Sequence, residues 1–117
     1  MIIGNGVDIT EVRRLRQAVD KWGESFLNRV FTEEELKNAK TRGSLYQHLA
    51  GRFAVKEAVF KALGDKGLNW KDVQVLNDKE GRPHCAILNN KGRGLDVHVS
   101  ISHVKNYAVA NAIITKK

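Results

Sequence analysis

Gly51-Arg-Phe-Ala-Val-Lys-Glu-Ala-Val-Phe-Lys-Ala-Leu-Gly64 belongs to the longest predicted helix, which covers residues 44–63. At 1.5 Å per residue this helix would be about 30 Å long. Apolar residues occur almost all round it, which is typical of a helix that is buried or lies in an interface. Alanines recur every four residues at positions 50, 54, 58 and 62 and form a flat row suited to close packing. We therefore expect a long central helix against which other elements pack.

The remaining segments predict mainly strands, with helices near the start of the chain. They are a strand over Ile2–Asp8, a helix over Glu11–Trp22, a hairpin over 73–76 and 83–88, and a hairpin over 97–103 and 107–115. Thr32 and Glu35 form a capping box that marks the start of another helix. No linker or repeat divides the chain, so we expect one domain over residues 1–117. Its class would be α+β, with an antiparallel sheet packed against the long central helix.

The composition limits the classes of function. The chain has 20 Lys and Arg against 13 Asp and Glu, a net charge of +7 that favours polyanionic partners such as nucleic acid, phosphorylated ligands or acidic proteins. Cys85 is the single cysteine, which excludes a disulfide framework and a thiolate metal cage. No signal peptide pattern or membrane-span length occurs, so we expect a cytoplasmic protein. A domain this small favours a surface cleft, or a groove completed by another subunit, over an enclosed cavity.

Two acidic residues could carry chemistry, and position alone leaves both open. Asp8 stands before a predicted helix with Glu11 three residues on, so it fits an N-cap. Two glycines on its face of the strand also leave space for a ligand or another backbone to approach. Glu57 could pair with Lys61 one helical turn on, which is worth about 0.2–0.5 kcal/mol. It could instead bind Mg²⁺, because acids are seldom buried without a partner and Mg²⁺ takes oxygen ligands.

Several basic residues are equally open to two interpretations. Arg52, Lys56 and Lys61 are either solvated charges or together a site for a polyphosphate. His103 ends a predicted strand, where a lone histidine is more often structural than a base. No Walker A loop, dinucleotide-binding glycine pattern or Cys/His zinc spacing occurs. Two classes remain: an enzyme that handles phosphorylated substrates, and a basic nucleic-acid-binding module without catalytic activity.

Four stretches add a resemblance to these observations. They are Gly4-Asn-Gly-Val-Asp8-Ile-Thr-Glu-Val12, Phe31-Thr-Glu-Glu-Glu-Leu36, Phe53-Ala-Val-Lys-Glu57-Ala-Val-Phe-Lys61-Ala-Leu-Gly64, and Val99-Ser-Ile-Ser-His103 with Tyr107-Ala-Val-Ala110. In this order they resemble the holo-(acyl-carrier-protein) synthase family of 4'-phosphopantetheinyl transferases, in its short bacterial form. The resemblance is collinear over the whole chain. One position departs from it, because Val104 follows the Ser-His pair where the family often has a small polar residue.

The resemblance implies a reaction. The chain would transfer 4'-phosphopantetheine from coenzyme A to a serine of apo acyl carrier protein, depend on Mg²⁺, release adenosine 3',5'-bisphosphate and support fatty acid biosynthesis. Asp8 and Glu57 would bind the Mg²⁺ on the pyrophosphate, and Lys56 would be a third catalytic residue. The acceptor of the serine proton stays open between Glu57 and a metal-bound water.

The resemblance also implies binding residues and an assembly. The positions that match coenzyme contacts are Arg52, Lys56, Lys61, Gly64, Pro83 and His103. Among them, Arg52 would favour the 3'-phosphate of the nucleotide. Arg14 and Lys21 match helix positions that face the acidic carrier protein, which would give the positive charge a partner. The expected protein is a phosphopantetheinyl-transferase-like homotrimer with active sites between subunits, without nucleic acid or membrane as a partner.

Overall fold

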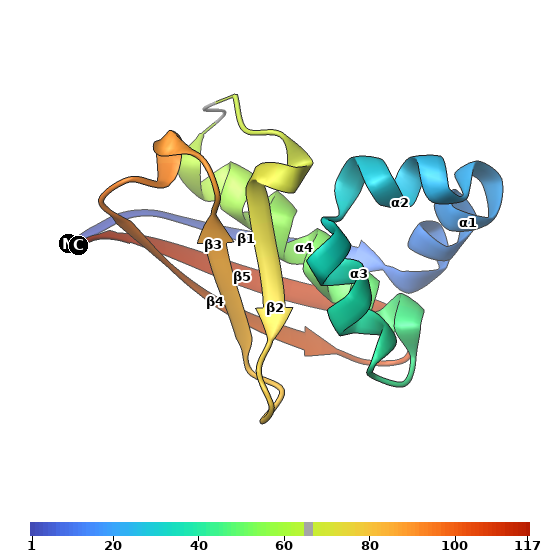
Figure 1. The fold of residues 1–117 in the computed structure, drawn as a ribbon. Coiled ribbons are helices and arrows are strands. Elements are labelled where there is room, and N and C mark those ends of the chain that lie inside the picture. The colour runs from blue at the N-terminus through green and yellow to red at the C-terminus, as the bar shows by residue number, and fades with distance from the viewer. Residues whose placement is uncertain (65–66) are drawn as a thin grey trace.

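The protein is described by a computed structural model that covers residues 1–64 and 67–117. In chain order its elements are β1 (Ile2–Glu11), α1 (Val12–Trp22), α2 (Glu24–Val30), α3 (Glu33–Lys40), α4 (Leu45–Leu63), the 3-10 helix η1 (Trp70–Asp72), β2 (Val73–Asn77), β3 (Pro83–Ile87), the 3-10 helix η2 (Asn90–Gly92), β4 (Leu95–His103) and β5 (Tyr107–Lys116). Figure 1 shows α1, α2 and α3 gathered at one end of the molecule and both chain termini at the other. No helix within the described ranges is long and apolar enough to cross a membrane.

The strands form two antiparallel sheets. One has three strands in the order β1-β5-β4, and the other is the hairpin of β2 and β3. Both predicted hairpins are therefore confirmed, and the α+β class with antiparallel pairing is confirmed with them. The pairing of the first strand with the last had no local signal in the sequence; it brings Val7 opposite Asn111, which in turn lies opposite Ser100.

Helix α4 packs against the three-stranded sheet at very short range. A Cβ atom added to Gly4 would lie 2.1 Å from the carbonyl oxygen of Ala62, and one added to Gly6 would lie 2.1 Å from that of Ala58. Only glycine permits this approach, so the space beside Asp8 is used by another backbone. The predicted row of alanines provides the matching flat face of the helix, and the long central helix is confirmed.

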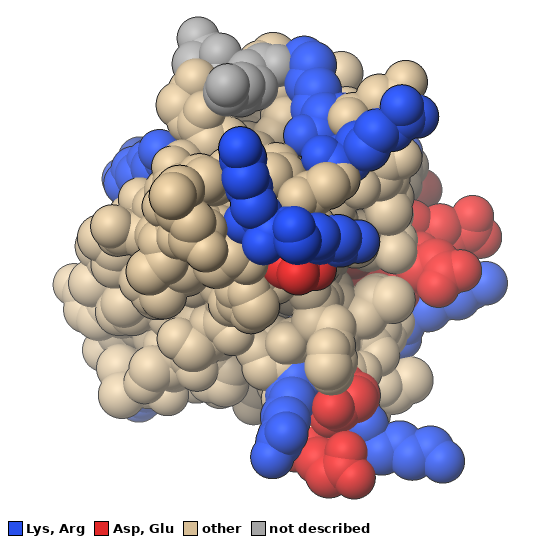
Figure 2. All heavy atoms as spheres, turned by 90° about the vertical axis from the view of Figure 1, so that its left-hand side faces the viewer, with Lys and Arg blue, Asp and Glu red and all other residues tan. Residues whose placement is uncertain are grey.

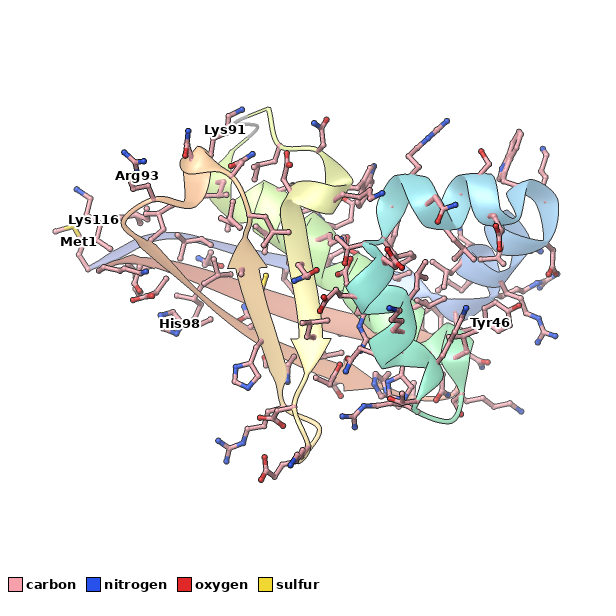
Figure 3. All side chains as sticks on the ribbon, in the orientation of Figure 1. Met1, Tyr46, Lys91, Arg93, His98 and Lys116 are labelled. Atoms are coloured by element: carbon pink, nitrogen blue, oxygen red, sulfur yellow. The ribbon has the colours of Figure 1, made fainter. Side chains whose placement is uncertain are left out.

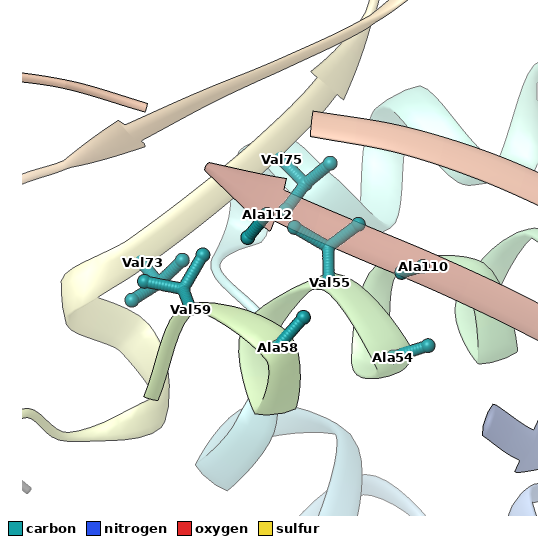
Figure 4. Close-up of a cluster of buried hydrophobic side chains, with 8 residues drawn as sticks. All are labelled: Ala54, Val55, Ala58, Val59, Val73, Val75, Ala110 and Ala112. Atoms are coloured by element: carbon teal, nitrogen blue, oxygen red, sulfur yellow. The ribbon is translucent and has the colours of Figure 1, made fainter. Parts of the chain in front are cut away.

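The core surrounds α4 on both sides. Figure 4 shows the first cluster, in which α4 lies between β5 and β2. Its buried members are Ala54, Val55, Ala58, Val59, Val73, Val75, Ala110 and Ala112. A second cluster joins the other half of α4 to the three shorter helices, and its buried members are Leu15, Val30, Phe31, Ala39, Leu49, Ala50 and Ala108. Nearly all α4 faces are thus covered, as the apolar pattern predicted.

The start of the chain differs in detail from the sequence prediction. Strand β1 continues to Glu11, which pairs with Tyr107, and α1 consequently begins at Val12. Helix α2 was not predicted; it follows Gly23, whose φ of 58° allows the sharp change of direction. The capping box at α3 is confirmed, with Thr32 Oγ1 accepting from the Glu35 amide and Glu35 Oε1 accepting from the Thr32 amide.

The outer face of the three-stranded sheet, directed away from α4, is rich in exposed apolar side chains. On β1 the exposed fractions of Val7 and Ile9 are 57% and 63%, and on β5 that of Val109 is 38%. These residues alternate along their strands with the buried set that packs on α4. An apolar sheet face open to water is typical of an interaction surface.

Candidate active site

Asp8 and Glu57 lie in one surface hollow, although 48 residues separate them in the sequence. The hollow has a volume of about 410 Å³ and is bounded by β1, α1, α2 and α4. Its lining residues are Asp8, Ile9, Thr10, Glu11, Arg14, Leu15, Ala18, Phe26, Phe53 and Glu57. The structure therefore brings together the two acids that the resemblance implied. We call this the acidic hollow.

Asp8 is held in place by two donors. The Thr10 hydroxyl donates to its Oδ2 at 2.9 Å, and the Lys61 ammonium donates to its Oδ1 at 3.2 Å. Helix α1 has Glu11 at its N-cap position without any side-chain cap. Asp8 is consequently not a helix cap, and the alternative interpretation of a side chain directed into a site is the one that agrees with the structure.

Glu57 makes no hydrogen bond or ion pair with any residue that the structure describes. Lys61, its expected helical partner, instead contacts Asp8 and donates to the Val7 carbonyl at 3.1 Å. Burial and the nearby Asp8 carboxylate raise the pKa of Glu57, and Lys61 opposes this rise. The ammonium of Lys61 is thus the one positive charge that acts on both the Asp8 and the Glu57 carboxylates, so this pair of acids carries an excess of negative charge.

This arrangement fits a divalent cation. No cluster of three or more His, Cys, Asp or Glu side chains that could hold a metal occurs in the described ranges. Mg²⁺, however, is commonly bound through one or two carboxylates together with waters and substrate phosphates. Asp8 and Glu57 supply such a pair of oxygen ligands, and the unpartnered Glu57 is the side chain that a cation would stabilise.

Lys56 is not among the described residues that line the acidic hollow, and its predicted role beside the phosphates stays a prediction. Its side chain is fully buried. The ammonium donates to Glu35 Oε1 at 2.8 Å and to the carbonyls of Trp70 and Val73 at 2.9 and 2.5 Å. All three protons of the ammonium therefore have acceptors within the protein. Burial lowers the pKa of Lys56, while Glu35 opposes that shift and keeps the pair together.

Arg52 is likewise buried, with 1% of its surface exposed. Its predicted contact with the 3'-phosphate stays a prediction. Its Nε donates to the Val75 carbonyl at 3.1 Å, and its Nη2 donates to the amide oxygens of Asn38 and Asn77. Burial lowers its pKa to about 10, so the guanidinium stays charged at neutral pH. Of the three helical cations predicted to form a polyphosphate site, Lys61 is the one with an exposed side chain.

Pro83 and His103 line a second hollow, with a volume of about 250 Å³. Its lining residues are Arg42, His48, Gly51, Asn77, Gly81, Pro83, Ile101 and His103. The rings of His48 and His103 meet edge to face with centroids 5.5 Å apart. Sequence reasoning missed Arg42 and His48, since nothing in their spacing connects a loop, a helix and a strand end. We call this the basic hollow.

The two hollows lie on opposite sides of α4. His48 lines one and Glu57 lines the other, and nine residues correspond to about two and a half turns of helix. The hollows share none of their described lining residues. The structure therefore brings Asp8, Glu57 and Lys61 together, and Pro83 with His103, but it does not bring these two sets together in one chain.

Of the remaining predicted residues, Gly64, Arg14 and Lys21, Arg14 is the one among the described lining residues of a hollow. Gly64 ends α4 in the left-handed region, with φ at 65°, which accounts for glycine there without reference to a ligand. Arg14 lines the acidic hollow, and both Arg14 and Lys21 are exposed on α1. Seven residues are about two turns, so these two basic side chains share one face of the helix. The ammonium of Lys21 also lies 4.9 Å from the ring centroid of Trp22.

The geometry defines the class first: an α+β protein with antiparallel sheets and two separate surface hollows, one acidic and one basic. The sequence model of the 4'-phosphopantetheinyl transferase superfamily matches residues 4–112. The chain therefore belongs to this superfamily and is a transferase. The resemblance found in the four sequence stretches is confirmed.

Individual relatives cover the whole chain. It is similar to the holo-(acyl-carrier-protein) synthases of Thermodesulfovibrio yellowstonii, with 48% identity over 98% of this chain and 100% of the relative, and of Halothermothrix orenii, with 45% identity over 94% of each. Among solved structures, the holo-(acyl-carrier-protein) synthase of Bacillus anthracis in complex with CoA (3',5'-ADP) matches with a TM-score of 0.85, 39% identity and coverage of 100% and 99%. The Helicobacter pylori enzyme in complex with coenzyme A matches with a TM-score of 0.85, 26% identity and coverage of 95% and 99%. These matches confirm the α+β fold of the family.

Proposed function

We propose that the chain, as a single domain over residues 1–117, transfers 4'-phosphopantetheine from coenzyme A to a serine of an apo acyl carrier protein. The reaction would serve fatty acid biosynthesis in the cytoplasm. The observation that carries this proposal is the meeting of Asp8 and Glu57 in one hollow beside Lys61. It is supported by the relatives named as holo-(acyl-carrier-protein) synthases and by the related structures that contain coenzyme A.

In the proposed mechanism, Asp8 and Glu57 would hold Mg²⁺, which when bound neutralises negative charge on the phosphate oxygens. The serine oxygen of the carrier forms a bond to the phosphorus that bears pantetheine, and the bond from that phosphorus to the bridging pyrophosphate oxygen breaks. Adenosine 3',5'-bisphosphate leaves with the bond's electron pair. Lys61 orients Asp8 through their 3.2 Å contact and adds positive charge beside the phosphates. A cation bound there would favour the ionised form of Glu57 and so oppose the burial and the Asp8 charge that raise the pKa of Glu57.

We further propose a homotrimer with active sites between subunits. Among the coenzyme contacts implied by the family resemblance, Pro83 and His103 line the basic hollow, whereas Lys61 contacts Asp8 of the acidic hollow. The two hollows lie on opposite sides of α4. A coenzyme that uses both sets of residues would therefore bind the acidic hollow of one subunit and the basic hollow of its neighbour. The exposed apolar side chains on β1 and β5 supply a surface that the neighbours would cover.

Arg14 and Lys21 would guide the carrier protein to this site. Both are exposed on one face of α1, and Arg14 borders the acidic hollow itself. A carrier with an acidic recognition surface would be attracted to this face before its serine reaches the phosphates. This placement would let the same helix bind the protein substrate and form one wall of the site.

The test is incubation with apo carrier protein, coenzyme A and Mg²⁺, followed by intact mass measurement of the carrier. We expect the carrier to gain one phosphopantetheine group. Glu57→Gln should abolish the gain, while the control Glu33→Gln should not, since Glu33 is an exposed helical glutamate that pairs with the exposed Lys37 at 3.8 Å. An unmodified carrier with the unaltered protein would refute the transferase proposal.

A nucleic-acid-binding module would also suit the net charge of +7. Figure 2 shows the end of the molecule that carries the termini, where basic side chains are spread over the surface and interspersed with acidic ones. Lys91, Arg93 and Lys116 lie at this end in Figure 3, far from Tyr46 at the other. This alternative leaves the pair of Asp8 and Glu57 without a role. Salt-dependent binding of DNA or RNA by a chain that does not bind coenzyme A would favour it.

A further inference from the structure

Thr10 lies two residues after Asp8 on β1 and has no part in the reaction described above. Residues two apart on a strand share one face, so Thr10 and Asp8 both lie on the face of β1 that packs on α4, while Ile9 lies on the outer face. Thr10 lines the acidic hollow, although only 9% of its surface is exposed. A buried hydroxyl thus stands beside one of the two acids of the site.

The two carboxylate oxygens of Asp8 have different partners. The Thr10 hydroxyl donates to Oδ2 at 2.9 Å, and the Lys61 ammonium donates to Oδ1 at 3.2 Å. Lys61 is one helical turn from Glu57 in the same row of α4, and its charge also acts on Glu57. Oδ1 is therefore the oxygen directed to the row that contains Glu57, and Oδ2 is the oxygen held by β1 itself.

Of these two donors, Thr10 is the more firmly placed. Its backbone lies in the ladder of β1 and β5, opposite Ala108, and its β-branched side chain has few χ1 rotamers. Lys61, in contrast, has 56% of its side chain exposed and a flexible four-carbon stem. Thr10 can therefore keep the Asp8 carboxylate in one orientation when a substrate phosphate attracts the ammonium of Lys61.

We propose that Thr10 is a positioning residue of the metal site, whose hydroxyl holds Oδ2 of Asp8 so that Oδ1 is available to a divalent cation beside Glu57. This inference rests on the proposed function and deepens it. Carboxylates that bind metals are commonly oriented by a further hydrogen bond, and loss of that partner lowers metal affinity or activity about 10–100-fold. Asp8 is one of two protein ligands in the proposed site, so its orientation matters more than in a site with many ligands. Thr10 acts through Asp8 and does not itself bind the cation or the substrate.

Two pairs of proteins isolate the contribution of the hydroxyl. Thr10→Val keeps the branched shape of the side chain and removes the hydroxyl, so it is compared with the unaltered protein. Thr10→Ser keeps the hydroxyl and removes the methyl group, and Thr10→Ala differs from it by the hydroxyl alone. The second pair still tests the inference if Thr10→Val does not fold.

The direct measurement is the affinity of the intact protein for Mn²⁺, a paramagnetic substitute for Mg²⁺, with coenzyme A present. Electron paramagnetic resonance gives the free ion, and a titration of coenzyme A alone is subtracted. We expect Thr10→Val to bind Mn²⁺ roughly tenfold more weakly than the unaltered protein, and Thr10→Ala roughly tenfold more weakly than Thr10→Ser. In the transfer assay, the Mg²⁺ concentration that gives half the maximal rate should rise about tenfold in Thr10→Val, while the rate at saturating Mg²⁺ stays nearly unchanged.

Thr115→Val is the matched control, because Thr115 is also a strand threonine whose hydroxyl has a partner, His98 Nε2 at 2.9 Å, and it is not among the described lining residues of either hollow. It should leave the Mn²⁺ affinity unchanged.

Two results would overturn the inference alone while transfer by the unaltered protein persists. One is an equal Mn²⁺ affinity with and without the Thr10 hydroxyl in both pairs. The other is a loss of rate in Thr10→Val that is the same at every Mg²⁺ concentration, which is the pattern of a purely structural residue. Failure of the unaltered protein to modify the carrier would instead overturn the proposed function, and the inference with it.

Discussion

Replacement of Lys56 by methionine tests whether this residue supports the fold or the reaction. The change keeps an unbranched apolar side chain and removes the terminal ammonium, so the space that it vacates is about that of one heavy atom. It leaves the Glu35 carboxylate fully buried without its cation, and the carbonyls of Trp70 and Val73 without a donor. Loss of one partner of a buried ion pair typically costs about 3–5 kcal/mol.

The cost is large compared with the free energy of unfolding of a native domain, which is about 5–15 kcal/mol. With a urea dependence of about 2 kcal/mol per molar, the midpoint of unfolding should fall by roughly 1.5–2.5 M. The assay is urea unfolding followed by tryptophan fluorescence, at one protein concentration for all variants, because oligomers unfold in a concentration-dependent manner. Adding Glu35→Gln to Lys56→Met should recover part of the loss, since it removes the uncompensated charge.

Lys37→Met is the control for this experiment. Lys37 also pairs with a glutamate, Glu33, but at 3.8 Å and with 77% of its side chain exposed. Such exposed pairs contribute about 0–1 kcal/mol, so its midpoint should barely move. If Lys56→Met unfolds at the same urea concentration as the unaltered protein, the structural role is refuted. If it also loses phosphopantetheine transfer at unchanged stability, Lys56 acts in the reaction as the family resemblance implied.

Four further predictions follow from single residues. Gly6→Ala should destabilise the protein by about 1–3 kcal/mol or more in urea unfolding, because its Cβ atom would lie 2.1 Å from the Ala58 carbonyl oxygen. An unchanged urea midpoint of unfolding would contradict the close packing of β1 on α4. Mg²⁺ affinity, measured by titration with coenzyme A present, should fall as the pH drops through the raised pKa of Glu57, because only the ionised carboxylate is a ligand. Above that pKa the affinity should be constant. An affinity that does not change with pH would exclude Glu57 as a ligand. Arg14→Ala should raise KM for the carrier protein more than KM for coenzyme A in steady-state kinetics, and equal effects would remove Arg14 from the carrier surface. Cys85 is partly exposed, but desolvation raises its pKa to about 12, so iodoacetamide should label it more slowly at pH 8 in the folded than in the unfolded protein. Equal labelling rates would contradict the raised pKa.

Much of the fold was predictable from local sequence patterns. The long helix, both hairpins and the capping box at Thr32 follow from periodicity and from turn and cap residues, and all are confirmed. The pairing of β1 with β5 was not predictable, because strand pairing across the whole chain has no local signal. Helix α2 was missed for a related reason: it has 7 residues, too few for a clear helical period.

The site was predictable only in part. The meeting of Asp8 and Glu57 depends on how α4 crosses β1, so spacing alone left each open and only the family resemblance paired them. The burial of Lys56 and Arg52 could not be predicted from periodicity, and the roles that the resemblance implies for them stay predictions. Arg42 was missed because its loop has no pattern that points to the basic hollow.

The burial of Lys56 and Arg52 has a physical reason in the topology. Among the strands that the structure describes, β2 pairs only with β3, so its other edge would present backbone groups without partners. Side chains from α3 and α4 bond to that edge in place of a third strand: Lys56 donates to the Val73 carbonyl, Arg52 to the Val75 carbonyl, and Glu35 accepts from the Val75 amide.

The four-residue spacing of Arg52 and Lys56 along α4 matches the spacing of the carbonyls that they contact on this edge of β2. Lys56 and Arg52 are one turn apart, about 6 Å along the helix axis, and the carbonyls of Val73 and Val75 that they contact are two strand residues apart, about 6.8 Å. The second row of the same helix, Glu57 and Lys61, has the same spacing but is rotated by about 100°. It therefore faces β1 and the acidic hollow, where Lys61 meets Asp8. Helix α4 thus carries two polar rows. The row of Arg52 and Lys56 contacts the unpaired edge of β2 and is structural, which leaves the row of Glu57 and Lys61 for the proposed reaction.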